Sequence, residues 1–220
     1  MYQFQVLAFG LGPAPRIFTK LMKVPISILR KSGIKIIIYL DDMLIIGSSL
    51  EEILKARDTT LFLLEALGFT INQPKSSLTP SHKCEFLGMI IDSLMMVIAL
   101  PSEKALNLMS QCQKFYQMRT VTLRDLSKII GKLYATAPAV SVAPMQTRAL
   151  QQVLIQAQHQ KLPYEELVTI SKEGLEELTW WKVNLQVANH RAINIDPPRI
   201  TIETDASKIA WGAHLIGGAQ

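Results

Sequence analysis

The sequence predicts an α+β fold: an antiparallel sheet with packed helices comes first, a row of helices follows, and a short strand pair comes last. Two β-branched and aliphatic runs flank a pair of acids in residues 36–47, which is typical of a β-hairpin. After Pro101 the apolar residues change from a period of two to a helical period. Residues 200–205 then return to the alternation of a strand.

Composition narrows the class of protein. The chain has 220 residues, 49% of them hydrophobic, which is enough for a sizeable core. Acids interrupt every long apolar stretch, so we expect no transmembrane helix. Cys84 and Cys112 lie in no metal-binding or disulfide pattern, and no secretory signal is visible, so we expect an intracellular protein. The net charge of +5 fits nucleic acid and ordinary solubility about equally well.

The first third of the chain predicts a strand, a loop, a helix and the hairpin. Residues 2–8 alternate weakly as a strand, and glycines and prolines over residues 10–15 predict a loop. A helix from about Arg16 to Lys31 follows and ends at Gly33. The hairpin comes next, with Asp41 and Asp42 at its turn.

The paired acids are the most informative feature. Burying the flanking strands while leaving two acids unpaired would cost several kcal/mol, so the turn must face water or hold cations. A solvated Asp-Asp turn is the simpler interpretation of these two residues alone. A divalent-metal site is the alternative, and the neighbouring motifs favour it.

The residues after the hairpin predict a helix, a strand and a second hairpin. Ser49 and Glu52 form a capping box for a helix that ends at Gly68. We expect this helix to cover one face of the sheet, with residues 69–72 as the next strand and Lys75 exposed beyond it. The apolar runs 85–91 and 94–100 predict another hairpin.

Four helices are predicted in the rest of the chain, before the last strand. Their ranges are Ser102–Gln117, Leu123–Ala135 with Thr122 as its cap, Met145–Gln160 and Ser171–Ala188. Trp180 and Trp181 could stack on bases, but tryptophans of an amphipathic helix more often fill a core. Residues 196–199 predict a linker before the strand at 200–205.

Four motifs, in order, resemble those of reverse transcriptases. Tyr39-Leu40-Asp41-Asp42 resembles the family's Tyr-x-Asp-Asp box. The segment from Leu7 to Phe18 resembles the loop and helix before that box. Gly68-Phe69-Thr70-Ile71-Asn72 with Lys75, and then Phe86-Leu87-Gly88, resemble the two motifs after it. The four motifs are most similar to those of retrotransposon enzymes of the tyrosine-recombinase and long-terminal-repeat types.

The resemblance implies a division of the chain. Residues 1–100 would be part of a polymerase palm, with a primer-gripping hairpin near its end. Residues 101–195 would be a helical thumb and connection, and residues 196–220 would be the start of a ribonuclease H domain. The alternating strand with Asp205 matches that domain's first metal carboxylate.

The resemblance also implies roles for individual residues. Asp41 would be a ligand of catalytic Mg²⁺ with Asp42 in support, and Asp205 would be a metal ligand of the ribonuclease H site. Phe9, Gly10 and Tyr39 would contact the nucleotide, although a plain strand-to-helix turn explains the first two as well. Lys75 would protonate pyrophosphate, although an exposed lysine is usually only solvated.

The implied partners are an RNA or DNA template-primer duplex and deoxynucleoside triphosphates, without a membrane. The oligomeric state is not predicted. The family needs a further palm aspartate, and no segment of this chain matches it. We therefore expect a part of an RNA-directed DNA polymerase that is inactive alone, with Asp205 chemically idle. The alternative is a non-catalytic or domesticated nucleic-acid-binding module.

Overall fold

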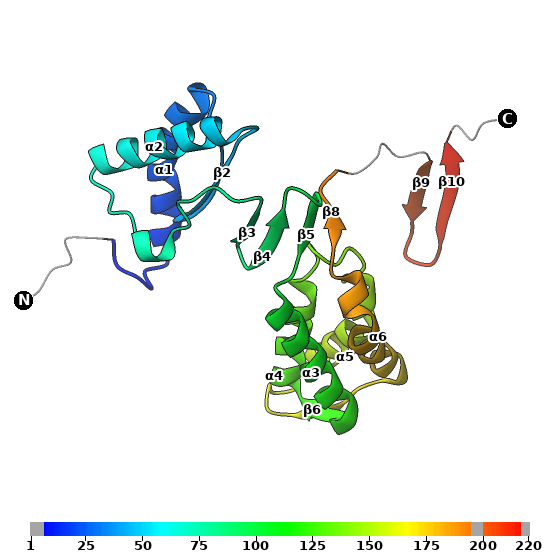
Figure 1. Cartoon of the computed structure of the whole chain (residues 1–220). Coiled ribbons are helices and arrows are strands. Elements are labelled where there is room, and N and C mark those ends of the chain that lie inside the picture. Colours follow the sequence, from blue (N-terminus) through cyan, green and yellow to red (C-terminus); the bar gives the residue numbers. More distant parts are fainter. Residues whose placement is uncertain (1–6, 195–199, 217–220) are drawn as a thin grey trace, which may run out of the picture.

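The computed structural model describes residues 7–194 and 200–216, and its mixture of helices with antiparallel strands confirms the α+β class. In Figure 1 the strands β3, β4 and β5 lie between an N-terminal lobe and a bundle of helices. The expected linker at residues 196–199, and nearly all of the expected strand at residues 2–8, lie outside the described residues.

The N-terminal lobe packs two helices against one hairpin. Helix α1 (Ala14–Lys31) and helix α2 (Leu50–Ala66) lie against β1 (Lys35–Tyr39) and β2 (Asp42–Ile46). Both helices and the hairpin are where the sequence predicts them. The lobe buries a small apolar cluster, consisting of Met22, Ile26, Leu29, Ile36 and Leu64.

The start of α2 differs from the expected capping box in one bond. The backbone N–H of Glu52 donates to Ser49 Oγ over 3.2 Å, as predicted. The Glu52 carboxylate accepts from the backbone N–H of Ser48 at 2.7 Å, one residue before the N-cap. That bond, ahead of a weaker attraction from Lys35, holds the pKa of the Glu52 carboxyl below its usual value.

The predicted strand at residues 69–72 is wrong. These residues form no strand, and a 3₁₀ turn, η1 (Gln73–Lys75), follows them. The backbone N–H of Phe69 donates back to Leu64 at the end of α2, so it is not offered to a neighbouring strand. The apolar side chains still pack inward, since the Phe69 ring meets Phe18 edge-on with centroids 6.5 Å apart.

The second sheet contains a turn that the sequence prediction missed. Its strands are β3 (Lys83–Phe86), β4 (Met89–Asp92), β5 (Val97–Ala99) and β8 (Arg191–Ala192), in that order and all antiparallel. The run 85–91 was expected as one strand, but it reverses at Leu87-Gly88, where φ is 51° and 72°. Two positive φ angles suit a tight two-residue hairpin loop. The expected hairpin around Asp92-Ser93 is present between β4 and β5.

The helical region confirms all four predicted helices. They are α3 (Ser102–Met118), α4 (Leu123–Tyr134), α5 (Arg148–His159) with the 3₁₀ turn η2 (Met145–Thr147) before it, and α6 (Lys172–Ala188). Two short antiparallel strands, β6 (Thr120–Thr122) and β7 (Leu167–Thr169), join the α3–α4 connection to the α5–α6 connection. Trp181 is fully buried, and its Nε1 donates to the Gln146 carbonyl at 2.6 Å, so it is a core residue as expected.

The last described element is an isolated hairpin. Strands β9 (Thr201–Ala206) and β10 (Trp211–Ile216) pair antiparallel, and all of their residues are exposed. Within the described part of the chain, no helix is long and apolar enough to cross a membrane. The domain limits at residues 100/101 and 195/196 stay predictions.

We expect Trp181→Ala to lower the free energy of unfolding of the helical region by about 3–5 kcal/mol, because it leaves a large cavity. The matched change Val183→Ala, at a residue on the same helix that is 63% exposed, should cost less than about 0.5 kcal/mol. Urea denaturation followed by far-UV circular dichroism measures both. Equal losses would mean that α6 does not pack through Trp181.

Candidate functional site

The carboxylates of Asp41 and Asp42 lie at the tight turn of the β1–β2 hairpin, and one face of this hairpin packs on the core of the lobe. In the β1–β2 register Ile36 pairs with Ile45 and Ile38 with Met43, and these four side chains pack on the lobe's core. Because side chains alternate along a strand, the opposite face carries the pair Tyr39 and Asp42. The core therefore fixes the hairpin while its other face meets solvent.

Leu40 and Asp41 alone connect the paired residues Tyr39 and Asp42. Leu40 has a φ of 53°, a left-handed value that costs a non-glycine residue on the order of 1–3 kcal/mol. Sequence reasoning did not single out Leu40, although a two-residue hairpin loop demands a positive φ at its first position. Strain of this kind persists only where the surrounding packing holds the turn.

Asp41 and Asp42 are both exposed. Within residues 7–194 and 200–216, no hydrogen bond or ion pair involves either carboxylate. The turn thus faces water, and its oxygens are available to a cation. Hard divalent cations prefer such oxygen ligands. In the same described residues, no group of three His, Cys, Asp or Glu side chains is placed to hold one metal ion.

The remaining predicted site residues lie on other elements. Phe9 is fully exposed in the loop before α1, beside Gly10, whose φ of 84° suits glycine. Lys75 is exposed and ends η1. Asp205 is exposed on β9 opposite Gly212, and it accepts a hydrogen bond from the backbone N–H of Ala206 at 2.9 Å. Tyr39, Asp41 and Asp42 are brought together at the β1–β2 turn.

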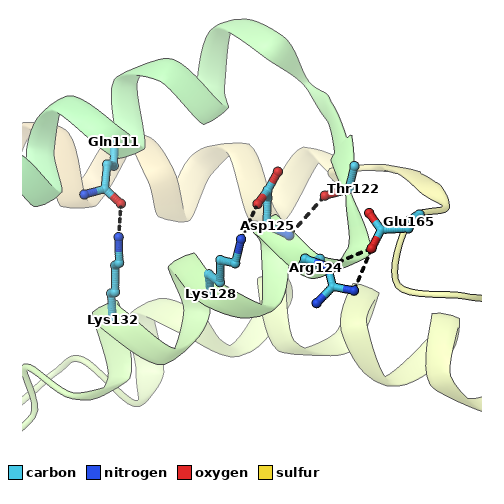
Figure 2. A network of polar contacts seen from close by, with 7 residues as sticks. All are labelled: Gln111, Thr122, Arg124, Asp125, Lys128, Lys132 and Glu165. Carbon is cyan, nitrogen blue, oxygen red and sulfur yellow. Dashed lines mark hydrogen bonds and ion pairs between the residues drawn. The ribbon is translucent and has the colours of Figure 1, made fainter.

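A second candidate surface lies on α3 and α4. Residues 101–135 carry six basic and two acidic side chains, so the positive surplus of the helical region is concentrated there. Figure 2 shows the polar contacts along α4. Lys128 Nζ lies 3.1 Å from Asp125 Oδ1, and Lys132 Nζ donates to Gln111 Oε1 of α3 at 2.8 Å.

Acids restrain part of this basic surface. The Arg124 guanidinium pairs with Glu165 at 2.6 Å and lies 5.5 Å from the centre of the Tyr164 ring. Hydrogen bonds from Lys128 and Thr122 hold the pKa of the Asp125 carboxyl below its usual value. These pairs are exposed, so they orient side chains more than they stabilise the fold.

Comparison with known proteins places these features in a family. Residues 1–91 match the family model described as "Reverse transcriptase (RNA-dependent DNA polymerase)". This match assigns residues 1–91 of the chain to the reverse transcriptase family. A "Putative enzymatic polyprotein" of Cassava vein mosaic virus is 30% identical over 222 aligned residues, covering 97% of this chain and 31% of the relative. A "Genome polyprotein" of Petunia vein clearing virus (isolate Shepherd) is 32% identical over 88 residues, or 40% of this chain and 4% of the relative.

Solved structures extend the likeness of fold to nearly the whole chain. A foamy viral protease-reverse transcriptase in complex with dsDNA matches with a TM-score of 0.63 and 19% identity, covering 97% of this chain and 41% of that one. A second structure, of a foamy viral protease-reverse transcriptase dRH in complex with ds DNA, matches with a TM-score of 0.61 and 19% identity, covering 92% of this chain and 35% of that one. The retrotransposon subtype stays a prediction.

We expect Asp125→Asn to destabilise the helical region at neutral pH and to have no effect in acid. Because the folded-state pKa of Asp125 is lowered, its contribution is present above the unfolded-state pKa and is lost as the pH falls through the folded-state value. Melting temperatures of both proteins between about pH 7 and about pH 3 measure the difference. In a Lys128→Gln background the effect should shrink. A difference that does not change with pH would contradict this.

Proposed function

We propose that this chain is part of an RNA-directed DNA polymerase and that its β1–β2 turn belongs to the polymerase active site. One observation carries the proposal: two adjacent carboxylates, which make no ion pair within residues 7–194 and 200–216, stand on a turn whose strands are anchored in a core. Membership of the reverse transcriptase family supports it. Because the chain spans only about a third of its Cassava vein mosaic virus relative, the activity belongs to the longer protein.

The carboxylates fit Mg²⁺ as the proposed cofactor. Asp41 is the principal ligand in this proposal, and Asp42 supports it from the first position of β2. Their exposure leaves room for water and for phosphate oxygens, which Mg²⁺ usually keeps among its ligands. When bound, such ions supply activation of a primer hydroxyl and stabilisation of charge on the phosphates.

The chain's own residues would orient the reactants around that centre. The anchored hairpin would hold the carboxylates in a fixed place, and Tyr39, opposite Asp42, would contact the nucleotide. Phe9 and Gly10 would line the nucleotide pocket, and Lys75 would supply a proton to the leaving pyrophosphate. Asp205 would act only within a ribonuclease H site that other residues complete.

A non-catalytic nucleic-acid-binding module is the second candidate. In the described residues, no third His, Cys, Asp or Glu side chain joins the two carboxylates in a metal-binding group, but the match to the reverse transcriptase model does not favour this alternative. Two-metal catalysis loses its geometry without a bridging ligand. The two candidates differ in whether a longer protein with the remaining palm sequence copies a template.

A template-primer duplex is the proposed partner of the basic surface on α3 and α4. Lys128 and Lys132 are exposed one turn apart on α4, and Lys114 is exposed on α3. Lysines in such a row bind phosphates without reading the base sequence. The dsDNA in the foamy viral complexes supports a duplex as the partner, with deoxynucleoside triphosphates as the proposed substrates.

In a longer protein that includes the rest of the palm, Asp41→Asn should lower primer extension by at least about 100-fold. The change keeps the shape of the side chain and removes the charge that holds the metal. Asp58→Asn, which removes another exposed carboxylate from the same lobe, is the control and should retain activity. Near-normal extension by Asp41→Asn would make the hairpin a structural turn. So would unfolding instead of inactivation.

Duplex binding by the 220-residue chain should weaken steeply with salt, and the double change Lys128→Gln and Lys132→Gln should lower the logarithmic salt slope by about two. The control, Lys161→Gln with Lys172→Gln, removes the same charge away from α4. Fluorescence anisotropy at several salt concentrations measures both slopes. Equal effects of the two pairs would mean that net charge, and not the α4 surface, governs binding.

A further inference from the structure

The helical region joins the second sheet at two chain segments that lie side by side. Residue pairs Val97–Ala192 and Ile98–Arg191 define the antiparallel register of β5 and β8. Continuing that register by two residues places Leu100 opposite Asn189. Leu100 comes just before α3, and Asn189 is the C-cap of α6. The entrance and the exit of the helical region therefore meet at this pair.

The Asn189 side chain makes the bonds that a strand backbone would make. The backbone N–H of Leu100 donates to Asn189 Oδ1 at 2.6 Å, and Asn189 Nδ2 donates to the Leu100 carbonyl at 3.1 Å. Directly opposed residues of an antiparallel ladder exchange two bonds in the same way. The two backbone groups also fix the orientation of the amide, because the N–H requires an oxygen and the carbonyl requires a donor.

No other common side chain of this length can replace that pair of bonds. Leu100 is only 3% exposed, so its N–H and C=O depend largely on protein partners. An aspartate could accept from the N–H but could not donate to the carbonyl, and an alanine could do neither. A buried group left without a partner is costly, which makes this amide a specific requirement and not a general polar contact.

Other contacts among the described residues also join the sheet to the helices. Met89, Ile98 and Leu100 of the sheet side pack against the helical core. The Lys104 ammonium reaches the Gly88 carbonyl at 3.4 Å, a long and exposed bond. Beyond Asn189, β8 has only two residues, followed by a bond from the Ile193 N–H to the Met96 carbonyl at 2.8 Å. The apolar contacts have no preferred direction, whereas the two hydrogen bonds of the Asn189 amide fix how the end of α6 is oriented on the sheet.

We propose that Asn189 is a positioning residue, which sets the orientation of the helical region relative to the β3–β4–β5–β8 sheet by extending the β5–β8 ladder with its side chain. This positioning role follows from the bonds between Asn189 and Leu100 and from the β5–β8 register. Its use rests on the proposed function: it would keep the duplex-binding helices in a fixed relation to the β3–β4 hairpin.

The test compares Asn189→Ala and Asn189→Asp with Asn184→Asp in the 220-residue chain. Asn184 is a matched control, because its Nδ2 donates to the Trp180 carbonyl within α6 and does not reach the sheet. Hydrogen exchange at the Leu100 amide should speed up by about tenfold to a hundredfold in Asn189→Ala. Asn184→Asp should leave exchange at Leu100 unchanged.

A distance measurement separates positioning from stability. Spin labels at Leu94→Cys, in the β4–β5 turn, and Leu106→Cys, on α3, replace side chains that are 72% and 55% exposed. Cys84→Ser removes the partly exposed thiol. Cys112 can stay, because burial raises the pKa of its thiol to about 12 and it is fully buried.

We expect one narrow distance distribution in the parent and in Asn184→Asp, and a broadened or shifted one in both Asn189 variants. Circular dichroism and burial of Trp181 should show that the helices still fold. If Asn189→Ala unfolds the helical region, Asn189→Asp, which retains an acceptor for the Leu100 N–H, decides the question. An unchanged distribution in folded Asn189 variants would overturn the proposal. Loss of duplex binding or of polymerase activity in the longer protein would not bear on this result.

Discussion

The inward-facing side of the β1–β2 hairpin is the constraint on which the candidate metal centre depends. Four side chains of the two strands pack on the lobe's core, and this packing fixes a turn that has too few residues to relax. Leu40 absorbs the resulting strain with its left-handed backbone. The carboxylates gain a defined position although neither of them makes a hydrogen bond or ion pair within the part of the chain that the structure describes. Repulsion between adjacent charges is tolerable there because both face water.

The core is divided unequally between the two ends of the chain. Among the residues that the structure describes, five buried residues form the cluster of the N-terminal lobe, whereas 21 form the cluster that includes the helices α3 to α6. The lobe also leaves an apolar row exposed on α1, composed of Ile17, Leu21, Val24 and Ile28. A lobe with this small a core has less apolar burial to stabilise it than the helical region has.

Sequence reasoning succeeded where local signals and burial agree. The helices around Trp181 have strong periodicity and N-caps at Thr122 and Ser171, so their limits were predicted within a few residues. The turn with Asp41 and Asp42 was found from its motif. The failures have physical causes: residues 69–72 have a strand-like composition but no partner strand, and the reversal at Leu87-Gly88 interrupts an apolar run that reads as one strand. The roles of the site residues depend on which side chains lie near one another in space, and the local sequence pattern does not contain this information.

The adjacency of Leu100 and Asn189 also has a consequence for how such a chain can change. The helical region leaves the sheet at Leu100 and returns to it at Asn189, which lies opposite. It is therefore a long insertion between two neighbouring strands, β5 and β8, of one antiparallel ladder. A tight turn joining β5 directly to β8 would leave that ladder's order unaltered. Bundles of different length or surface charge could therefore be exchanged at this junction if they kept an apolar surface against Met89, Ile98 and Leu100, much as an insert is exchanged in a loop whose ends are already close.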